Sequence, residues 1–359
     1  MILLNPGPVT LSPGVRAALA GPDLCHREPE YEALAAAIRR RLLGVYGLDP
    51  ERWAAVLLTG SGTAAVEAMV SSLVPRGARL LVVENGVYGE RIAEIARRHG
   101  IDLARHTLPW GAAVEAAPLE AALAASGADH VAVVHHETTT GRLNDLAAVA
   151  AACEGHGARL LVDAVSSFGG EALDLEGWGI TACAASSNKC LHGPPGLAFV
   201  VARREALAAT AGRSLYLDLA TYQRAAEAGA PPFTPAVQTA FALGRALEEL
   251  EAEGGWRRRR DRYRALAARV RRGLLALGFE PLLPEGASSA VLAAYRLPPG
   301  RSYAALHDHL KARGFTVYAG QGGLAGEIVR IAVMGAIGEA EVERLLDHVA
   351  EWVHGSVDR

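Results

Sequence analysis

The chain has 36 basic side chains, and only two of them, Lys189 and Lys311, are lysines. Arginine stays charged and cannot act as an amine nucleophile, whereas lysine can lose its proton and condense with an aldehyde. Lys189 stands in Ala185-Ser186-Ser187-Asn188-Lys189-Cys190, and a Gly-Pro-Pro-Gly turn follows at 193–196. Because small polar neighbours and a turn favour a cleft over a charged helix face, we expect Lys189 to be a reactive amine.

A second candidate element is Thr59-Gly60-Ser61-Gly62-Thr63, which joins an expected strand directly to an expected helix. Small residues let the backbone approach a ligand, and the free N–H groups at a helix N-terminus favour phosphate. The segment lacks the Gly-Lys-Ser/Thr ending of a nucleotide P-loop, which argues against ATP. Taken alone, such a turn is equally compatible with a structural role.

A third element is Asp163, which ends the apolar run Arg159–Asp163. A carboxylate at the carboxyl end of a parallel strand lies in the ligand crevice and can pair with a protonated pyridine nitrogen, although Asp163 could equally cap a helix. Pyridoxal phosphate (PLP) needs a phosphate anchor, a carboxylate for its ring nitrogen and an amine for its aldehyde. The chain offers all three, with Lys189 placed 26 residues after Asp163.

This combination resembles the class V aminotransferases of PLP fold type I, and the resemblance covers nearly the whole chain. Within that class, the sequence is most similar to the 2-aminoethylphosphonate:pyruvate transaminase group. The segments that carry the resemblance are Asn5-Pro6-Gly7-Pro8, Cys25-His26-Arg27-Glu28, Gly60-Ser61-Gly62-Thr63, Asn85-Gly86-Val87-Tyr88-Gly89, His136-Glu137-Thr138-Thr139-Thr140-Gly141, Asp163-Ala164-Val165-Ser166-Ser167-Phe168-Gly169-Gly170 and Ser187-Asn188-Lys189-Cys190.

The resemblance implies roles for individual residues. It implies a homodimer with shared active sites, in which Thr234 reaches the phosphate in the site of the partner subunit. It also implies that Pro6, Gly7 and Arg330 contact the substrate. The remaining implied cofactor contacts are Ser61, Gly62, Thr63 and Asn188 at the phosphate, Tyr88 stacked on the ring, Thr139 beside the ring, Asp163 at the ring nitrogen and Lys189 at the aldehyde.

Arg330 matches the arginine that such enzymes direct at the acidic group of the substrate, and a guanidinium suits a carboxylate or a phosphonate equally well. The implied reaction moves the amino group of 2-aminoethylphosphonate to pyruvate, giving phosphonoacetaldehyde and alanine, with Lys189 carrying the proton. The segment Ile331–Gly335 departs from the Gly and Asn that often follow in the family. An alanine- or serine-glyoxylate (or pyruvate) aminotransferase therefore stays as the alternative. Tyr318–Gly322 is expected to form a mobile loop over the site.

Two further alternatives stay open. A lyase such as a cysteine desulfurase needs a reactive cysteine on a flexible loop, for which Cys25 is the candidate, because Cys190 directly follows the lysine. A cofactor-binding protein without catalysis is disfavoured by the complete set of Asp163, Lys189 and Arg330.

Apolar β-branched runs alternate with Ala/Leu/Arg helical patterns along the first 200 residues, which is typical of βαβ units. The pattern predicts an α/β fold with a mostly parallel sheet covered by helices, plus a smaller α+β C-terminal domain. The resemblance to PLP fold type I implies that the sheet is of the seven-stranded type. Expected strands are 55–58, 79–83, 131–135, 159–163 and 197–202, and expected helices are 64–72, 90–99, 118–124 and 146–156.

The expected domain organisation has three parts. Residues 1–14 form an N-terminal segment that joins the small domain and active site, 15–235 form the large PLP-binding domain, and 236–359 form a linking helix and the small domain. A long helical region is expected over 235–277. The C-terminal elements are expected at 290–295, 303–313, 316–318 and 329–333, with a final helix from 337.

Charge and composition limit the partners. A net charge of −3 and a pI near 6.5 provide no positive field for nucleic acid or an anionic membrane. We interpret Arg257–Arg260 as a solvated helix face. No signal peptide or membrane-spanning run is evident, so a cytoplasmic location is expected. The four cysteines have no metal-ligand spacing, and no metal is expected.

Overall fold

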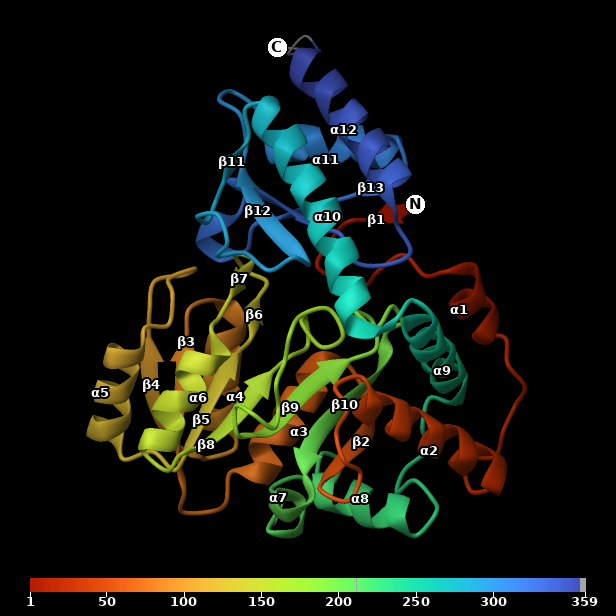
Figure 1. The fold of residues 1–359 in the computed structure, drawn as a ribbon, viewed down its shortest axis with the longest axis vertical. Coiled ribbons are helices and arrows are strands. Elements are labelled where there is room, and N and C mark those ends of the chain that lie inside the picture. The colour runs from red at the N-terminus through yellow and green to blue at the C-terminus, as the bar shows by residue number, and fades with distance from the viewer. Residues whose placement is uncertain (211, 356–359) are drawn as a thin grey trace.

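A seven-stranded sheet in the order β2-β10-β9-β8-β5-β3-β4 forms the centre of the larger part of the molecule (Figure 1). The computed structural model describes residues 1–210 and 212–355. All strands run parallel except β10, which is antiparallel to both of its neighbours, so the expected mostly parallel sheet is confirmed. The strands are β2 (Trp53–Gly60), β3 (Arg79–Glu84), β4 (Asp102–Thr107), β5 (His130–Val134), β8 (Arg159–Asp163), β9 (Ile180–Ser186) and β10 (Gly196–Arg203).

Helices cover both faces of this sheet, which is why its inner strands are apolar on both sides. In β5, for example, Val131 and Val133 belong to one core cluster, whereas Ala132 and Val134 belong to the other. The helices on the first face are α2 (Pro29–Gly44), α5 (Ala116–Ser126), α6 (Leu146–Gly155) and α9 (Val237–Ala252). Those on the second face are α3 (Gly62–Leu73), α4 (Val87–Arg98), α7 (Arg204–Ala208) and α8 (Leu219–Glu227).

A smaller antiparallel sheet, β11-β12-β15-β14, lies in the other part of the chain with its own apolar core (Figure 1). The N-terminal strand β1 pairs in parallel with β13, so the first residues of the chain lie against this part. The elements are β1 (Ile2–Leu3), β11 (Glu280–Pro281), β12 (Leu292–Arg296), α11 (Tyr303–Ala312), β13 (Phe315–Thr316), β14 (Tyr318–Ala319), η1 (Gly322–Leu324), β15 (Ile328–Ala332) and α12 (Glu339–His354).

The expected helical region 235–277 consists of two helices, α9 and α10 (Gly255–Ala276). They are separated at Gly254 and Gly255, whose φ angles of 99° and 78° suit glycine and break the helix. Helix α10 then runs from the large sheet to the small one (Figure 1). A short helix α1 (Pro13–Ala18) and a hairpin of β6 (His136–Glu137) and β7 (Arg142–Leu143) complete the fold.

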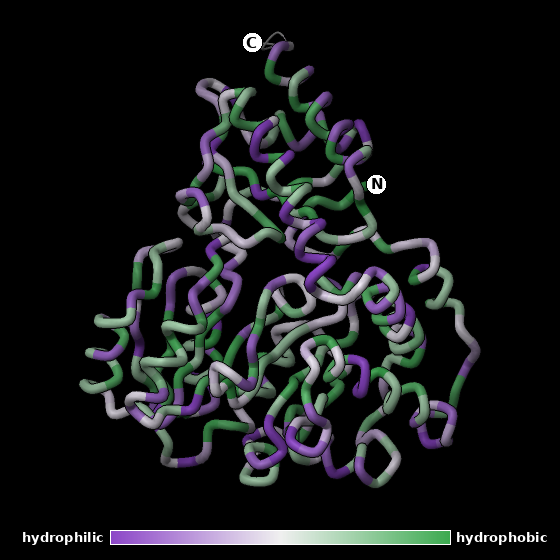
Figure 2. The backbone as a smooth tube through the Cα atoms, viewed as in Figure 1, coloured by the Kyte–Doolittle hydropathy of each residue, from purple (hydrophilic) through white to green (hydrophobic). Residues whose placement is uncertain are grey.

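The expectation that Arg257–Arg260 form a solvated face is wrong for Arg259, which is buried. Its Nε donates to Glu253 and its Nη1 to the carbonyl oxygen of Cys190, both at 2.8 Å. Helix α10 does carry hydrophilic stretches, while the central strands are mostly hydrophobic (Figure 2). Within the described residues, no helix combines the length and the hydrophobicity that crossing a bilayer requires.

Candidate active site

Lys189 lies in the turn between β9 and β10 and is covered by the N-terminal segment. Its Nζ donates a hydrogen bond to the carbonyl oxygen of Pro6. A β-carbon on Gly7, whose φ is +124°, would lie 2.7 Å from the lysine Cε. Burial lowers the pKa of Lys189 to about 8, with Asp163 raising it and Arg330 lowering it by smaller amounts. The amine is therefore far easier to deprotonate than an exposed lysine.

Asp163 ends β8 at the sheet edge where β9 also ends, because the two strands are parallel. The carboxylate is buried, and its Oδ1 accepts the Val165 N–H at 2.9 Å. Burial raises its pKa to about 6. Among the described residues this buried carboxylate forms no ion pair with an arginine or a lysine, so it can accept a hydrogen bond from a protonated nitrogen of a ligand.

The segment from Ser61 to Thr63 forms the N-terminus of α3, where the first N–H groups have no acceptor in a preceding turn. Ser61 is the N-cap residue, yet its side chain makes no capping hydrogen bond. A β-carbon on Gly62 would lie 2.6 Å from Val165 Cγ1, so only glycine fits beside that side chain. This helix N-terminus has its amides and hydroxyl available for an anion, as phosphate binding requires.

A cavity lies between the N-terminus of α3 and Asp163. It encloses about 370 Å³, its open mouth included. Tyr88 lies on its wall, and the Arg91 guanidinium lies 4.8 Å from the centre of the Tyr88 ring. Nη1 of Arg91 also donates to the hydroxyl of Thr63 at 3.3 Å. The lining residues are Gly62, Thr63, Val66, Tyr88, Arg91, Ile92, Val134, His136, Asp163, Val165 and Ser166.

Glu137 stabilises the N-terminus of α4, the part of the cavity wall to which Tyr88 belongs. Its Oε2 accepts the backbone N–H groups of Tyr88 and Gly89 at the N-terminus of α4, where a carboxylate is favoured. Its Oε1 accepts the hydroxyl of Thr139 at 2.6 Å. Burial raises the pKa of Glu137. Thr139 is fully buried and its hydroxyl is occupied by Glu137 and by the Val87 N–H, so it supports the wall rather than lining the cavity.

Arg330 lies in the middle of β15 and is buried. Its Nε donates to the carbonyl oxygen of Ala319 at 2.8 Å, and its Nη1 donates to that of Thr138 at 2.9 Å. Among the described residues no carboxylate forms an ion pair with it. The guanidinium is close enough to Lys189 to lower the pKa of the amine. Its positive charge is therefore available to an anionic ligand.

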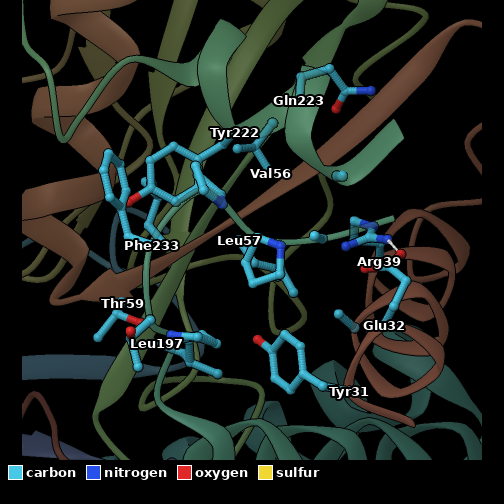
Figure 3. A pocket seen from close by; sticks show the side chains of 18 of the residues that line it. Tyr31, Glu32, Arg39, Val56, Leu57, Thr59, Leu197, Tyr222, Gln223 and Phe233 are labelled. Atoms are coloured by element: carbon cyan, nitrogen blue, oxygen red, sulfur yellow. Dashed lines mark hydrogen bonds and ion pairs between the residues drawn. The ribbon is translucent and has the colours of Figure 1, made fainter. Parts of the chain in front are cut away.

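The expected site residues do not all lie together. Asn188 is half-buried in the turn of Lys189, whereas Thr234 is exposed on the wall of a different pocket. That pocket is lined by parts of α2, β2, α8 and the segment 230–235, with Tyr31, Thr59 and Phe233 directed into it (Figure 3). The prediction of a mobile loop at Tyr318–Gly322 is wrong for its first two residues, because they form strand β14, in which Tyr318 pairs with Arg330.

Sequence reasoning missed Arg91, His136 and the supporting role of Glu137. Arg91 follows Tyr88 by three residues on a helix, which places both on one face, and this spacing was a usable signal. His136 and Glu137 stand inside a segment that carried the resemblance, but nothing in their spacing separates a wall residue from a core residue.

The geometry fits PLP. Gly62 leaves space at a helix N-terminus with unused donors, Asp163 offers a buried carboxylate, and Lys189 offers an amine of lowered pKa at the same sheet edge. Lys311, the other lysine, is exposed on α11. The site thus contains the three groups that the sequence predicted together.

Comparison with known proteins agrees with this geometry. The family model for class V aminotransferases matches residues 30–345. The chain is 42% identical to 2-aminoethylphosphonate–pyruvate transaminase of Aeromonas hydrophila subsp. hydrophila, covering 96% of this chain and 93% of the relative. It is 37% identical to the enzyme of the same name from Syntrophobacter fumaroxidans, covering 98% and 96%.

Solved structures of aminotransferases have the same fold as this chain. An aspartate aminotransferase from Thermus thermophilus superposes with a TM-score of 0.91 at 32% identity, covering 99% of this chain and all of that one. An alanine–glyoxylate aminotransferase from Nostoc sp. gives 0.91 at 27% identity, covering 98% and 94%. The expectations of fold type I, of an aminotransferase and of PLP as its cofactor are confirmed, and the chain belongs to the PLP-dependent class V aminotransferase family.

Proposed function

We propose that this enzyme transfers the amino group of 2-aminoethylphosphonate to pyruvate, giving phosphonoacetaldehyde and alanine. The two relatives that are named 2-aminoethylphosphonate–pyruvate transaminase are 42% and 37% identical to this chain, and each aligns with at least 96% of it. The solved relatives that act as aspartate or alanine–glyoxylate aminotransferases, by their names, are less similar in sequence, at 32% and 27% identity.

The structural observation that supports an acidic donor is the buried Arg330, which forms no ion pair with a carboxylate among the described residues. The choice of a phosphonate over a carboxylate rests on the named relatives. Burying an unpaired charge is costly, so such a guanidinium is retained where a ligand supplies the opposite charge. It lies on the Lys189 side of the site. A donor that carries its amine two carbons from a phosphonate can place the anion at Arg330 and the amine toward Lys189.

PLP, when bound, supplies an electron sink for the negative charge left when the donor carbon loses its proton. We propose that Ser61, Gly62 and Thr63 hold its phosphate with Asn188 nearby, that Tyr88 stacks on its ring with Thr139 supporting that wall, that Asp163 keeps its ring nitrogen protonated, and that Lys189 condenses with its aldehyde.

The proton transfers belong to Lys189. With cofactor and donor bound, the free Nζ of Lys189 would take the proton from the carbon that bears the donor amine and would hold it for delivery, and a pKa of about 8 suits an amine for both steps at neutral pH. The Asp163 carboxylate would hold the proton on the ring nitrogen of the bound cofactor. Pro6 and Gly7 cover the amine and exclude water from it, which places them at the substrate side of the site.

The proposal includes a homodimer in which Thr234 reaches the phosphate of the partner subunit. In its support, Thr234 is exposed and does not line the cofactor cavity of its own subunit, and Leu215 and Tyr216 are large exposed hydrophobic side chains, the second of them on the same pocket as Thr234. Exposed apolar side chains of this size favour coverage by another chain. Removal of the Thr234 hydroxyl should then weaken PLP binding without changing the fold.

A lyase that uses a cysteine nucleophile is not favoured. Cys190 is buried, and burial raises its pKa to about 12, so its thiol stays protonated. Cys25 is exposed and does not line the cavity.

Parallel assays with single donors test the function. The purified enzyme is given pyruvate with 2-aminoethylphosphonate, or glyoxylate with alanine, serine or aspartate, and the aldehyde or keto-acid product is quantified. We expect kcat/KM to be highest for the phosphonate by at least tenfold. A higher kcat/KM for alanine, serine or aspartate would mean that the enzyme is an amino-acid aminotransferase and not a phosphonate transaminase.

A further inference from the structure

His192 stands three residues after Lys189, in a strained part of the same turn. Its φ of +66° makes it the one non-glycine residue with a left-handed backbone among residues 1–210 and 212–355. This conformation is uncommon for residues that carry a side chain and costs free energy, so it persists where the surrounding contacts impose it. The backbone N–H of His192 donates to the carbonyl oxygen of Lys189 at 2.9 Å. The strained residue is therefore joined directly to the lysine.

The ring of His192 is buried and contacts the segment between β15 and α12. Its Nε2 lies 2.9 Å from the backbone nitrogen of Gly335 and 2.5 Å from the hydroxyl oxygen of Tyr263 on α10. Because a backbone N–H can only donate, Nε2 is the acceptor and Nδ1 carries the proton. Burial, with Arg259 and Arg262 nearby, lowers the pKa of His192 well below its usual value. The ring is therefore neutral at pH 7 and keeps this lone pair.

Gly335 follows β15 by three residues, and β15 carries Arg330. The segment is itself closely packed, because a β-carbon on Gly335 would lie 2.8 Å from the carbonyl oxygen of Thr10. The contact of His192 with Gly335 thus joins the turn of Lys189, which belongs to the large sheet, to the strand of Arg330, which belongs to the small one.

A second connection between the two parts runs through the N-terminal segment. The carbonyl oxygen of Leu4 accepts the Ala332 N–H at 2.8 Å, and that of Pro6 accepts a hydrogen bond from Nζ of Lys189. This connection ends on the reacting amine, so it cannot hold a fixed spacing once the amine moves to react. The contact through His192 uses the backbone of the turn and not the amine, and it can persist throughout the reaction.

The spacing between Lys189 and Arg330 matters for the choice of donor. The amine of the donor has to reach the Lys189 side of the site while its anionic group binds Arg330. One additional carbon atom lengthens a donor by roughly 1 Å. A misplacement of about 1 Å at a reacting centre can lower the rate by about 100-fold. A rigid spacing therefore selects donors by the number of carbon atoms between amine and anion.

We propose that His192 is a specificity-determining positioning residue, whose contact with Gly335 fixes the separation of Lys189 and Arg330 and so selects donors of one length. The inference rests on the proposed function in its choice of phosphonates as test donors. The selection by length applies to any donor that carries an amine and an anionic group.

Half-reactions of the holoenzyme test this role. The bleaching rate of the cofactor band is measured with 2-aminoethylphosphonate and with 3-aminopropylphosphonate, which differ by one carbon atom, in the absence of an acceptor. His192→Gln keeps an oxygen long enough to accept the Gly335 N–H. His192→Asn is too short to reach it, but asparagine adopts the left-handed backbone more readily than glutamine. Backbone strain alone therefore ranks Asn above Gln, whereas the proposed contact ranks Gln above Asn.

We expect the wild type to react at least about tenfold faster with the two-carbon donor, as a misplacement of this size predicts. His192→Asn should lower this preference by at least about fivefold, and His192→Gln should keep it within about twofold. His192→Gly, which suits the left-handed backbone and has no side chain, replaces His192→Asn if that variant does not fold.

Three results would overturn the inference. The first is a wild type with less than about twofold preference between the two donors. The second is a His192→Asn variant that slows both donors by the same factor or slows neither, because the preference is then kept. The third is a His192→Gln variant that loses more of the preference than His192→Asn does.

A failure of the proposed function has a different signature. If the wild type reacts with neither phosphonate, the proposed donor is wrong, and the same proteins are compared with alanine and β-alanine, which also differ by one carbon atom between amine and acid. A loss of preference in His192→Asn that His192→Gln restores would then still support the inference. An unchanged preference in His192→Asn would overturn it.

Discussion

A β-carbon placed on Gly7 would lie 2.7 Å from Cε of Lys189, and 2.9 Å from its Nζ. The first residues of the chain and a residue in the middle of it therefore share one tightly packed site. The left-handed φ of +124° at Gly7 adds a second reason for glycine, because other residues rarely adopt it.

Replacing Gly7 by alanine should lower kcat by about tenfold or more, because displacing a reacting group by a fraction of an ångström is enough to lose that factor. Steady-state kinetics of Gly7→Ala measure it. Gly155→Ala is the matched control, since no atom lies within 4 Å of its β-carbon and its φ is not left-handed. Unchanged kinetics in Gly7→Ala would mean that the segment does not position the lysine.

Lys189→Arg should abolish transamination, with a loss on the order of 10³-fold or more, because a guanidinium keeps the charge but can neither condense with the aldehyde nor carry the proton. The visible absorption of the bound cofactor should also lose its lysine-dependent band. Lys311→Arg, on the exposed face of α11, should be indistinguishable from the wild type. If Lys189→Arg keeps more than about a tenth of the wild-type activity, Lys189 is not the residue that binds the aldehyde and carries the proton.

The capture of PLP by apoenzyme should depend on pH through Lys189. Since burial lowers the pKa of the amine to about 8, the reactive neutral form increases as pH rises toward 8 and is complete above it. Stopped-flow absorbance should show a capture rate that rises about tenfold per pH unit below 8 and then levels off. A rate that keeps rising to pH 10 would mean that the amine titrates like an exposed lysine.

Much of the large sheet follows from apolar β-branched runs such as Arg159–Asp163, whose bounds were predicted without error. The two strands that were missed lack this signal. β9 has only Ile180 and Thr181 as β-branched residues, and the rest of it is alanine, cysteine and serine, which give no apolar β-branched run. It is a strand because it is buried between β8 and β10. β4 is an edge strand with polar residues interspersed, so it shows no apolar run.

The chemical groups of the site were more predictable than their surroundings. Lys189 and Asp163 could be selected because the chemistry of PLP requires them and because a parallel sheet brings strand ends together. Arg259 could not be predicted as buried, because its partners, Glu253 and the carbonyl of Cys190, come together only through the tertiary fold. The same holds for Glu137, which accepts the Tyr88 N–H of α4 from 49 residues away in the chain.

Arg330→Lys should raise the KM for the phosphonate donor by roughly 10- to 100-fold while kcat falls less, because a lysine keeps the charge but loses the two-pronged contact. Arg330→Gln should have a larger effect. Thermal unfolding should accompany the kinetics, because Arg330 also donates to the carbonyl oxygens of Ala319 and Thr138. A loss of kcat with KM unchanged would place Arg330 outside the donor site.

A half-reaction monitored by absorbance tests the proposed amino donor most directly. Holoenzyme is mixed with 2-aminoethylphosphonate and no acceptor, with alanine, serine and aspartate in parallel, and the visible band of the bound cofactor is followed. We expect the phosphonate to bleach this band fastest and pyruvate to restore it. If the band persists with the phosphonate and bleaches with one of the amino acids, the account of the donor is contradicted.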